Sequence, residues 1–220
     1  MITSSWTGLY KSAAIIAWIT LGLIPVQIAI FIVWPPPSDV SEFFIVLKNT
    51  PLIGLLNLDL LYSLTVLFMG YLYLAFFVAL KDTHKSLSLI ALTLGLIGVA
   101  IYFNSHVSFE MLSLSKQYSL AESGNERIMF LTSGKVMLTK YKGTSFGAYY
   151  ILNGISLVLF SIAMLTAEVF SKRIALTGLV SGILMLIPTT VGLLGMIFGL
   201  TSLIPTSIWL FMVAKKLNQL

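Results

Sequence analysis

Cysteine is absent from all 220 positions of this sequence, and histidine occurs only twice. Disulfides, thiolate nucleophiles and cysteine-ligated metals are therefore excluded. Two histidines are too few for the three-histidine zinc centres that membrane hydrolases use. The sequence also lacks a phosphate-binding glycine loop, a nucleophile elbow and a metalloprotease motif. We therefore expect neither a metal nor a cofactor, and His106 with Asp59 and Glu110 is only a minor alternative for a metal site.

Charged residues are also scarce in this chain. Asp, Glu, Lys and Arg make up 10% of the residues, compared with about 25% in a soluble globular domain. Hydrophobic residues make up 58%, and apolar runs of about 20 residues, long enough to cross a bilayer, recur along the sequence. We therefore expect an all-α, multi-pass membrane protein that forms a single domain over residues 1–220.

Six membrane-spanning helices are expected from the apolar runs. They cover residues 13–34, 55–80, 87–107, 146–170, 174–192 and 196–214. Residues 174–214 contain no charged residue, so the last two helices are separated only by a tight turn, which we place within residues 189–195.

Positive charges gather on one side of these predicted helices. On the side of the N-terminus lie Lys11, Lys81, Lys85, Lys172, Arg173, Lys215 and Lys216, whereas the short connections on the other side carry only Lys48. Short loops rich in Lys and Arg face the cytoplasm. We therefore expect a plasma-membrane protein with both termini in the cytoplasm. The net charge of +5 then reflects membrane orientation, and we expect no nucleic acid partner.

The longest polar stretch, residues 108–145, lies outside the cell on this topology and still has a helical pattern. Its apolar residues share one helical face and are Phe130, Leu131, Gly134, Met137, Leu138 and Tyr141. Capping boxes at Ser119–Glu122 and Ser123–Glu126 mark helix starts. We expect an amphipathic helix over residues 120–140 that lies on the bundle or in the interface as a lid, after a shorter helix over residues 109–118.

Polar residues near the outer ends of three predicted helices form the candidate site. They are Asp59, Tyr62 and Ser63; Tyr102, Asn104, His106 and Glu110; and Tyr149 and Asn153. An ionisable residue in a membrane is a functional hypothesis, because a charge in hydrocarbon is costly. The three groups lie at one membrane level and can form an outward-facing vestibule in which a carboxylate orients His106 as a base or proton relay. Alternatively, these side chains are hydrated at headgroup depth and only end their helices.

A short internal repeat links two of the predicted helices. Residues 23–33 and 203–213 both begin with Leu-Ile-Pro and share the spacing of their apolar residues. Broken helices in related halves are found at transporter sites. Each proline can also be only a packing kink.

Four short stretches carry a resemblance to a known family: Trp34-Pro-Pro-Pro37, residues 109–115, residues 141–144 and residues 203–205. In these stretches the chain resembles the uncharacterised prokaryotic membrane family named domain of unknown function 4386. The resemblance covers nearly the whole chain and implies a bacterial or archaeal plasma-membrane protein of about six helices. It implies no reaction and no role for any residue.

Three functions are compatible with these features. The first is binding of a lipid-like or small amphipathic ligand in the outward-facing vestibule. The second is a subunit of a membrane complex or homo-oligomer, in which Gly95, Gly98, Gly178 and Gly182 let helices meet closely. The third is a lipid-modifying enzyme with His106 as base, which we rank last because the sequence offers no identifiable nucleophile. Membrane lipids are expected partners in each case.

Overall fold

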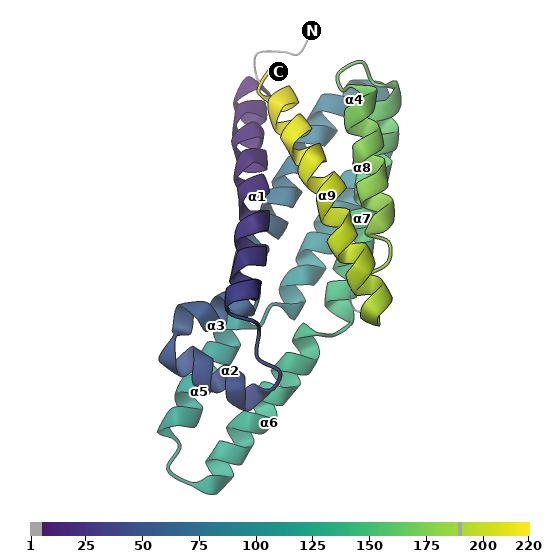
Figure 1. Ribbon diagram of the computed structural model, residues 1–220. Helices are drawn as coiled ribbons and strands as arrows, with labels where there is room; N and C mark the ends of the chain where they lie inside the picture. The colour runs from purple at the N-terminus through teal and green to yellow at the C-terminus, as the bar shows by residue number, and fades with distance from the viewer. Residues whose placement is uncertain (1–5, 189–190) are drawn as a thin grey trace.

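The computed structural model describes residues 6–188 and 191–220, and within these ranges the chain is all helical, without a strand. The helices are α1 (Thr7–Val33), α2 (Val40–Asn49), α3 (Pro51–Asn57), α4 (Leu60–Ser105), α5 (Ser108–Leu120), α6 (Gly124–Tyr141), α7 (Thr144–Thr166), α8 (Lys172–Leu184) and α9 (Gly192–Leu217). The predicted all-α fold is therefore confirmed. Figure 1 shows α1, α4, α7, α8 and α9 in one upright bundle. The start of α1 and the end of α9 lie at the same end of this bundle, which we name the terminal end; the opposite end is the distal end.

Helix α4 consists of two antiparallel limbs. His84 has φ −135° and ψ 50°, which is not a helical conformation, and it divides the helix. The first limb is residues 60–83 and the second limb is residues 85–105. The ring of Tyr62 lies 5.6 Å from the ring of Tyr102, and Gly70 lies against Val99. The chain therefore folds back at His84, between the predicted helices 55–80 and 87–107.

Four helical stretches of the described chain are long and apolar enough to cross a membrane: Thr7–Val33, Leu60–Leu120, Gly124–Thr166 and Gly192–Leu217. The second of these includes both limbs of α4. The expected count of six crossings is not confirmed. The predicted helix 174–192 ends at Leu184, and the 13 residues of α8 extend only about 20 Å, less than the roughly 30 Å of a hydrocarbon core. Residues 189–190 of the predicted turn lie outside the described residues, and α9 begins at Gly192.

The bundle is a closed ring of helices around an aromatic core. The order is α1, α4, α7, α8 and α9, since each helix packs against the next and α9 packs against α1. The ring of Phe76 lies 5.6 Å from that of Phe160 and 5.4 Å from that of Trp209. All three side chains are fully buried, so the bundle has a continuous hydrophobic interior.

Glycines bring the helices of the bundle into close contact. A Cβ atom at Gly182 of α8 would lie 2.9 Å from the carbonyl oxygen of Gly154 in α7. A Cβ atom at Gly178 would lie 2.6 Å from a side-chain nitrogen of α9, and Gly95 and Gly98 lie where α4 meets α7. The glycines considered for contacts between subunits therefore pack within this chain.

Replacing Gly182 with Ala is expected to destabilise the bundle by about 1–3 kcal/mol, because the backbone atoms of α7 that would meet the new methyl group cannot move aside. Gly22→Ala in α1 is the matched control, since a Cβ atom there meets nothing within 4 Å. Thermal unfolding in detergent should show a lower midpoint for Gly182→Ala only. An equal midpoint for the two variants would contradict the close contact between α7 and α8.

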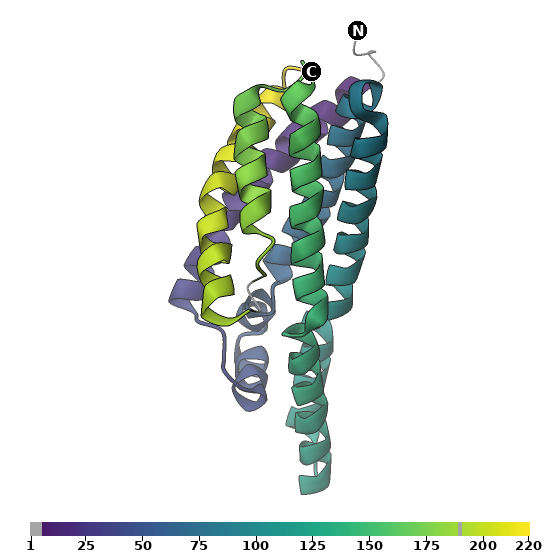
Figure 2. The same ribbon diagram turned by 90° about the vertical axis from the view of Figure 1, so that its right-hand side faces the viewer.

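Helices α2, α3, α5 and α6 form a second layer at the distal end of the bundle, which we name the distal layer. Figures 1 and 2 show the hairpin of α5 and α6 projecting beyond the bundle. The layer has its own buried apolar core, made of Val40, Phe43, Phe44, Leu47, Leu58, Val107, Met111 and Leu138. The most polar stretch of the chain is therefore a packed unit with a core of its own.

The predicted amphipathic helix corresponds to α6. Its predicted apolar face packs in the distal layer through Phe130, Leu131, Gly134, Met137, Leu138 and Tyr141. Ser123 and Glu126 form the second predicted capping box. Ser119 instead lies inside α5, where its hydroxyl donates to the carbonyl of Lys116, so the first predicted box is wrong. Because α6 packs against α5 and α2 and extends away from the bundle (Figure 2), the prediction that it covers the bundle as a lid is also wrong.

Several predicted helix ends shift in the structure. The predicted helix 146–170 ends at Thr166. The predicted helix 55–80 begins at Leu60, because the chain turns at Leu58 and Asp59 between α3 and α4. Asp59 has φ 63°, in the left-handed region where Asp is more common than most non-glycine residues. The predicted helix 87–107 ends at Ser105, so His106 is not helical.

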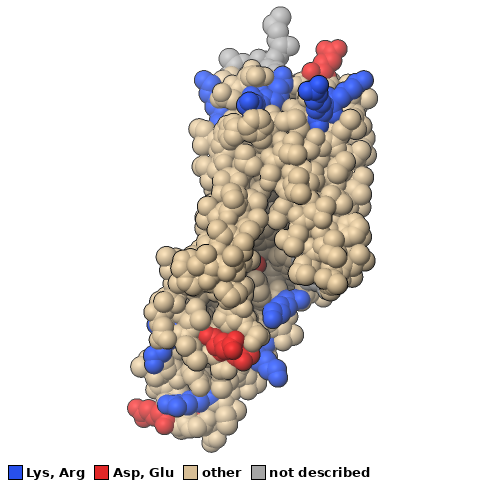
Figure 3. Space-filling view, in the orientation of Figure 1, with Lys and Arg blue, Asp and Glu red and all other residues tan. Residues whose placement is uncertain are grey.

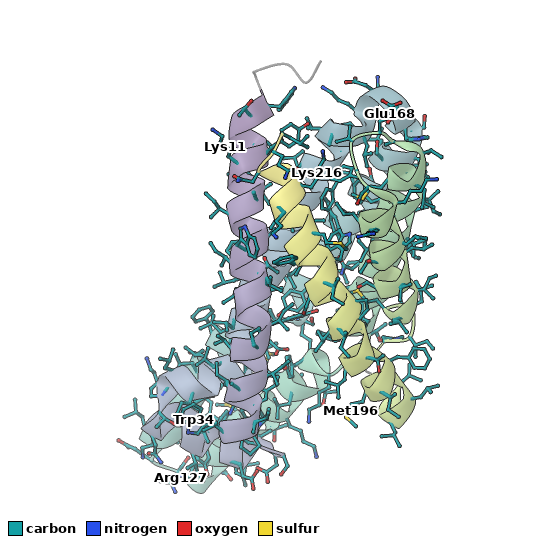
Figure 4. The ribbon with its side chains drawn as sticks, turned by 45° about the horizontal axis from the view of Figure 1, so that its top comes forward. Lys11, Trp34, Arg127, Glu168, Met196 and Lys216 are labelled. Atoms are coloured by element: carbon teal, nitrogen blue, oxygen red, sulfur yellow. The ribbon has the colours of Figure 1, made fainter. Side chains whose placement is uncertain are left out.

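Charged side chains are concentrated at the two ends of the molecule. Figure 3 shows an uncharged belt between the charged terminal end and the charged distal layer. In Figure 4, Lys11, Lys216 and Glu168 lie at the terminal end, and Trp34 and Arg127 lie at the distal end. An apolar belt between two charged ends is the surface of a membrane protein.

Candidate ligand-binding site

Asp59 is a buried carboxylate at the junction of the bundle and the distal layer. It immediately precedes α4, and 9% of its surface is exposed. Its Oδ2 atom accepts a 2.6 Å hydrogen bond from the hydroxyl of Tyr141, at the end of α6. Within the described residues no cationic side chain pairs with it. Burial raises the pKa of Asp59 to about 6, and the hydrogen bond from Tyr141 opposes part of this increase.

Aromatic rings from both limbs of α4 and from α7 pack beside Asp59. The ring of Tyr62 lies 5.6 Å from that of Tyr102 and 6.3 Å from that of Tyr149. The ring of Phe146 lies 6.1 Å from that of Tyr62. The hydroxyl of Tyr102 is buried and has no hydrogen-bond partner in the described part of the chain. The site therefore combines one carboxylate with a cluster of aromatic side chains.

A cavity of about 270 Å³ opens beside Asp59, between α1 and α9. The two helices touch nearer the terminal end, where the rings of Trp18 and Phe211 lie 5.4 Å apart, and they diverge towards the distal end (Figure 1). Figure 3 shows a hollow in the uncharged belt with acidic atoms at its base, and Asp59 is the acidic residue in the lining of this cavity. The cavity thus results from the divergence of α1 from α9.

The cavity has a polar end and an apolar end. Asp59 lies at the distal end, whereas Leu23 and Leu203, the first residues of the two repeated segments, lie deeper in the bundle. Gln27 of α1 lies between them, and both polar atoms of its side chain are buried without a partner among the described residues. An unpaired buried amide costs about 1–3 kcal/mol, so a bound molecule that bonds Gln27 would recover this free energy.

The sequence model of the family described as "Domain of unknown function (DUF4386)" matches residues 9–214. The chain belongs to the DUF4386 family. The match spans both the cavity and the distal layer. No match is found among curated proteins or among solved structures. The family description assigns no reaction, so a function for this DUF4386 member has to be argued from its own site.

His106 does not line the cavity in this DUF4386 chain. Its Nε2 atom lies 3.1 Å from the hydroxyl oxygen of Ser108, which itself lies 2.5 Å from the carbonyl oxygen of Leu58. Because the single hydroxyl proton goes to that carbonyl, Nε2 of His106 donates to Ser108. Ser108 is fully buried. The pair therefore fixes the turn next to Asp59 and does not present a nucleophile to a substrate.

The other predicted site residues are divided among several places. Asn104 donates a 3.1 Å hydrogen bond to the hydroxyl of Ser145, and Glu110 is exposed on α5. The hydroxyl of Ser63 donates to the carbonyl of Leu60. Asn153 is buried against the hydroxyl of Tyr73 in the contact between α4 and α7. Of the nine predicted residues, Asp59 and Tyr62 line the cavity, and Tyr102 and Tyr149 pack directly behind Tyr62.

Most residues of the site are not predicted from the sequence, among them Gln27, Thr65, Tyr141, Phe146 and Tyr150. Gln27 could have been predicted, because an amide in the middle of an apolar helix is costly without a hydrogen-bond partner. The other residues could not have been predicted, since their positions depend on how distant helices pack.

Within the described ranges, no three His, Asp or Glu side chains lie close enough together to hold a metal ion. The minor alternative of a site made by His106, Asp59 and Glu110 therefore has no geometric basis. Asp59 lines the cavity, His106 bonds Ser108, and Glu110 is exposed on α5.

Proposed function

We propose that the protein binds a lipid-like or other small amphipathic molecule in the cavity between α1 and α9. The observation that carries this proposal is the polarity of the cavity, which runs from Asp59 at the distal end to apolar walls deeper in the bundle. An amphipathic molecule matches this gradient, with its head beside Asp59 and its chain along α1 and α9. Ligand sites are commonly apolar cavities with a few convergent polar groups.

The size of the cavity limits the ligand to a small amphiphile. Its volume of about 270 Å³ is slightly below the roughly 300–1,000 Å³ of typical ligand cavities. A single alkyl chain with a compact head fits this volume better than a complete two-chain phospholipid. The open side between α1 and α9 gives such a molecule a route from the membrane.

We also propose that the terminal end faces the cytoplasm of a prokaryotic cell and that the cavity opens in the outer half of the plasma membrane. The support is the gathering of Lys and Arg at the terminal end, among them Lys11 and Lys216 (Figure 4). Short segments rich in Lys and Arg stay in the cytoplasm. This orientation can be tested by replacing exposed Ser86, beside the turn of α4, and exposed Asn125, in the distal layer, with cysteine. The labelling of the two cysteines would then be compared.

A substitution that fills the cavity is expected to abolish most of the binding. Ile28 and Ile32 lie one turn apart on α1; only Ile28 lines the cavity, and Ile32 is 75% exposed. Ile28→Trp should therefore block the cavity, whereas Ile32→Trp adds the same side chain on the outer surface and serves as the control. Binding of decyltrimethylammonium, decanol and decanoate to protein in nanodiscs would be measured for both variants. Equal binding of all three amphiphiles to unaltered protein and Ile28→Trp would refute the proposed function.

A further inference from the structure

The charge of the cavity points to a particular class of ligand. We infer that the ligand is a lipophilic organic cation, an amine or quaternary ammonium with an apolar chain, whose cationic centre lies beside the carboxylate of Asp59. This inference rests on the proposed function and adds the chemistry of the head group. It follows from three features of the described residues of the cavity: a carboxylate without a cationic partner, aromatic walls and the absence of a positively charged side chain.

The carboxylate of Asp59 lacks a cationic partner within the described residues. Its Oδ2 atom accepts the hydrogen bond from Tyr141, and its Oδ1 atom accepts none from that part of the chain. Oδ1 is also not among the fully enclosed polar atoms, as expected for an atom that reaches the cavity. Buried charges in proteins are normally paired, because an isolated charge away from water is very costly. A cation in the cavity would provide the missing partner.

Aromatic side chains line the same cavity as Asp59. Phe31, Tyr62, Phe146 and Tyr150 line it, from α1, α4 and α7. The π-electrons of aromatic rings attract organic cations, and cages of such rings are a common site for quaternary ammonium groups. A carboxylate with several aromatic side chains therefore favours an organic cation over an uncharged head.

Other ligand classes match the lining less well. Among the described residues, the lining contains no Lys, Arg or His, so an anionic head such as a phosphate would meet Asp59 without any compensating charge. A divalent metal requires several oxygen ligands, and the lining offers one carboxylate. An uncharged alcohol could bond Asp59 and Gln27, but it would leave the negative charge of Asp59 unpaired.

Three amphiphiles with the same decyl chain separate these classes. Decyltrimethylammonium, decanol and decanoate would be titrated against unaltered protein in nanodiscs, with Ile28→Trp nanodiscs as the reference for partition into the bilayer. We expect the ammonium to bind about ten-fold more tightly than decanol, and decanoate to bind most weakly. Asp59→Asn should remove the preference for the ammonium, since Asn keeps the shape of the side chain and tolerates the left-handed backbone.

The pH dependence gives a second test on the unaltered protein, in case Asp59→Asn folds poorly. A quaternary ammonium does not titrate, so its affinity should rise between about pH 5 and pH 7 as Asp59 ionises, with a pKa of about 6. Among the described residues, the ionisable side chains that interact with Asp59 are those of Tyr102 and Tyr141. Tyr62 lines the same cavity, and His106 lies beyond Ser108. His106→Gln should therefore leave this rise unchanged.

The outcomes separate the inference from the proposed function. Decanol or decanoate binding as tightly as the ammonium, with all binding lost in Ile28→Trp, would overturn the cationic ligand and keep the amphiphile site. An affinity for the ammonium that is unchanged in Asp59→Asn, or that does not vary with pH, would also overturn the inference. Binding of none of the three amphiphiles above the reference would refute both.

Discussion

Asp59→Asn is expected to stabilise the folded protein by about 3 kcal/mol above pH 7 and to leave its stability unchanged near pH 4. Burial raises the pKa of Asp59 from 3.8 in an unfolded chain to about 6 in the folded protein. The folded state therefore holds the proton more tightly, and stability is lost as the pH rises from about 4 to about 6. Asn resembles the protonated acid and can still accept the hydrogen bond from Tyr141. Unfolding of ligand-free protein in detergent between pH 4 and pH 8 would measure the difference.

Asp39 provides a control of opposite sign. It caps α2 by accepting a hydrogen bond from the backbone of Glu42, and this bond lowers the pKa of its carboxyl. Asp39→Asn should therefore lower stability at neutral pH, and the difference should shrink as the carboxyl protonates in acid. If Asp59→Asn showed the same direction of pH dependence as Asp39→Asn, the buried state of Asp59 would be wrong.

Phe44→Ala is expected to cost about 3–5 kcal/mol and to unfold the distal layer before the bundle. Phe44 is 2% exposed, and its ring lies 5.4 Å from that of Tyr118 in α5. The ring also occupies the space next to Gly134, where α6 passes over α2. Removing the ring would leave a void among three helices, because its apolar contacts would be lost. The hydrogen bond from the hydroxyl of Ser115 to the backbone carbonyl of residue 44 would remain.

Ile45→Ala is the matched control in the same helix, because Ile45 is 58% exposed. Hydrogen exchange should show faster exchange in α2, α5 and α6 for Phe44→Ala, with α7 and α9 protected as in the unaltered protein. Uniform protection in both variants would mean that the distal layer lacks the hydrophobic core described above. Equal loss of protection in the bundle would mean that the two layers unfold together.

The sequence was most informative where the pattern is local. The apolar face of α6 follows from residues three or four apart, and it packs as predicted through Phe130 and Leu138. The capping box of Ser123 and Glu126 depends on four consecutive residues and is present. The absence of charge predicted the uncharged belt, because the cost of a charge in hydrocarbon does not depend on the fold.

Features that depend on distant parts of the chain were not predictable. The break at Asp59 follows an apolar stretch that continues into α4, so composition gave no reason to end a helix there. The helix over residues 120–140 was expected on the bundle or in the interface, whereas the apolar face of α6 is covered by α5 and by α2, which no local pattern links to it. The cavity joins α1 to α9 across more than half of the chain, and the sequence offered only the repeated Leu-Ile-Pro segments as a hint.

Photolabelling with a decyltrimethylammonium analogue that carries a diazirine on its chain tests the ligand site most directly. Peptides of the labelled protein would be identified by mass spectrometry, with excess decyltrimethylammonium as competitor. The site predicts competed labelling on residues 23–31 of α1 and residues 196–203 of α9, which face each other across the cavity. Labelling confined to other apolar surfaces, such as the exposed face of α8, or labelling that the competitor does not reduce, would contradict a ligand site between α1 and α9.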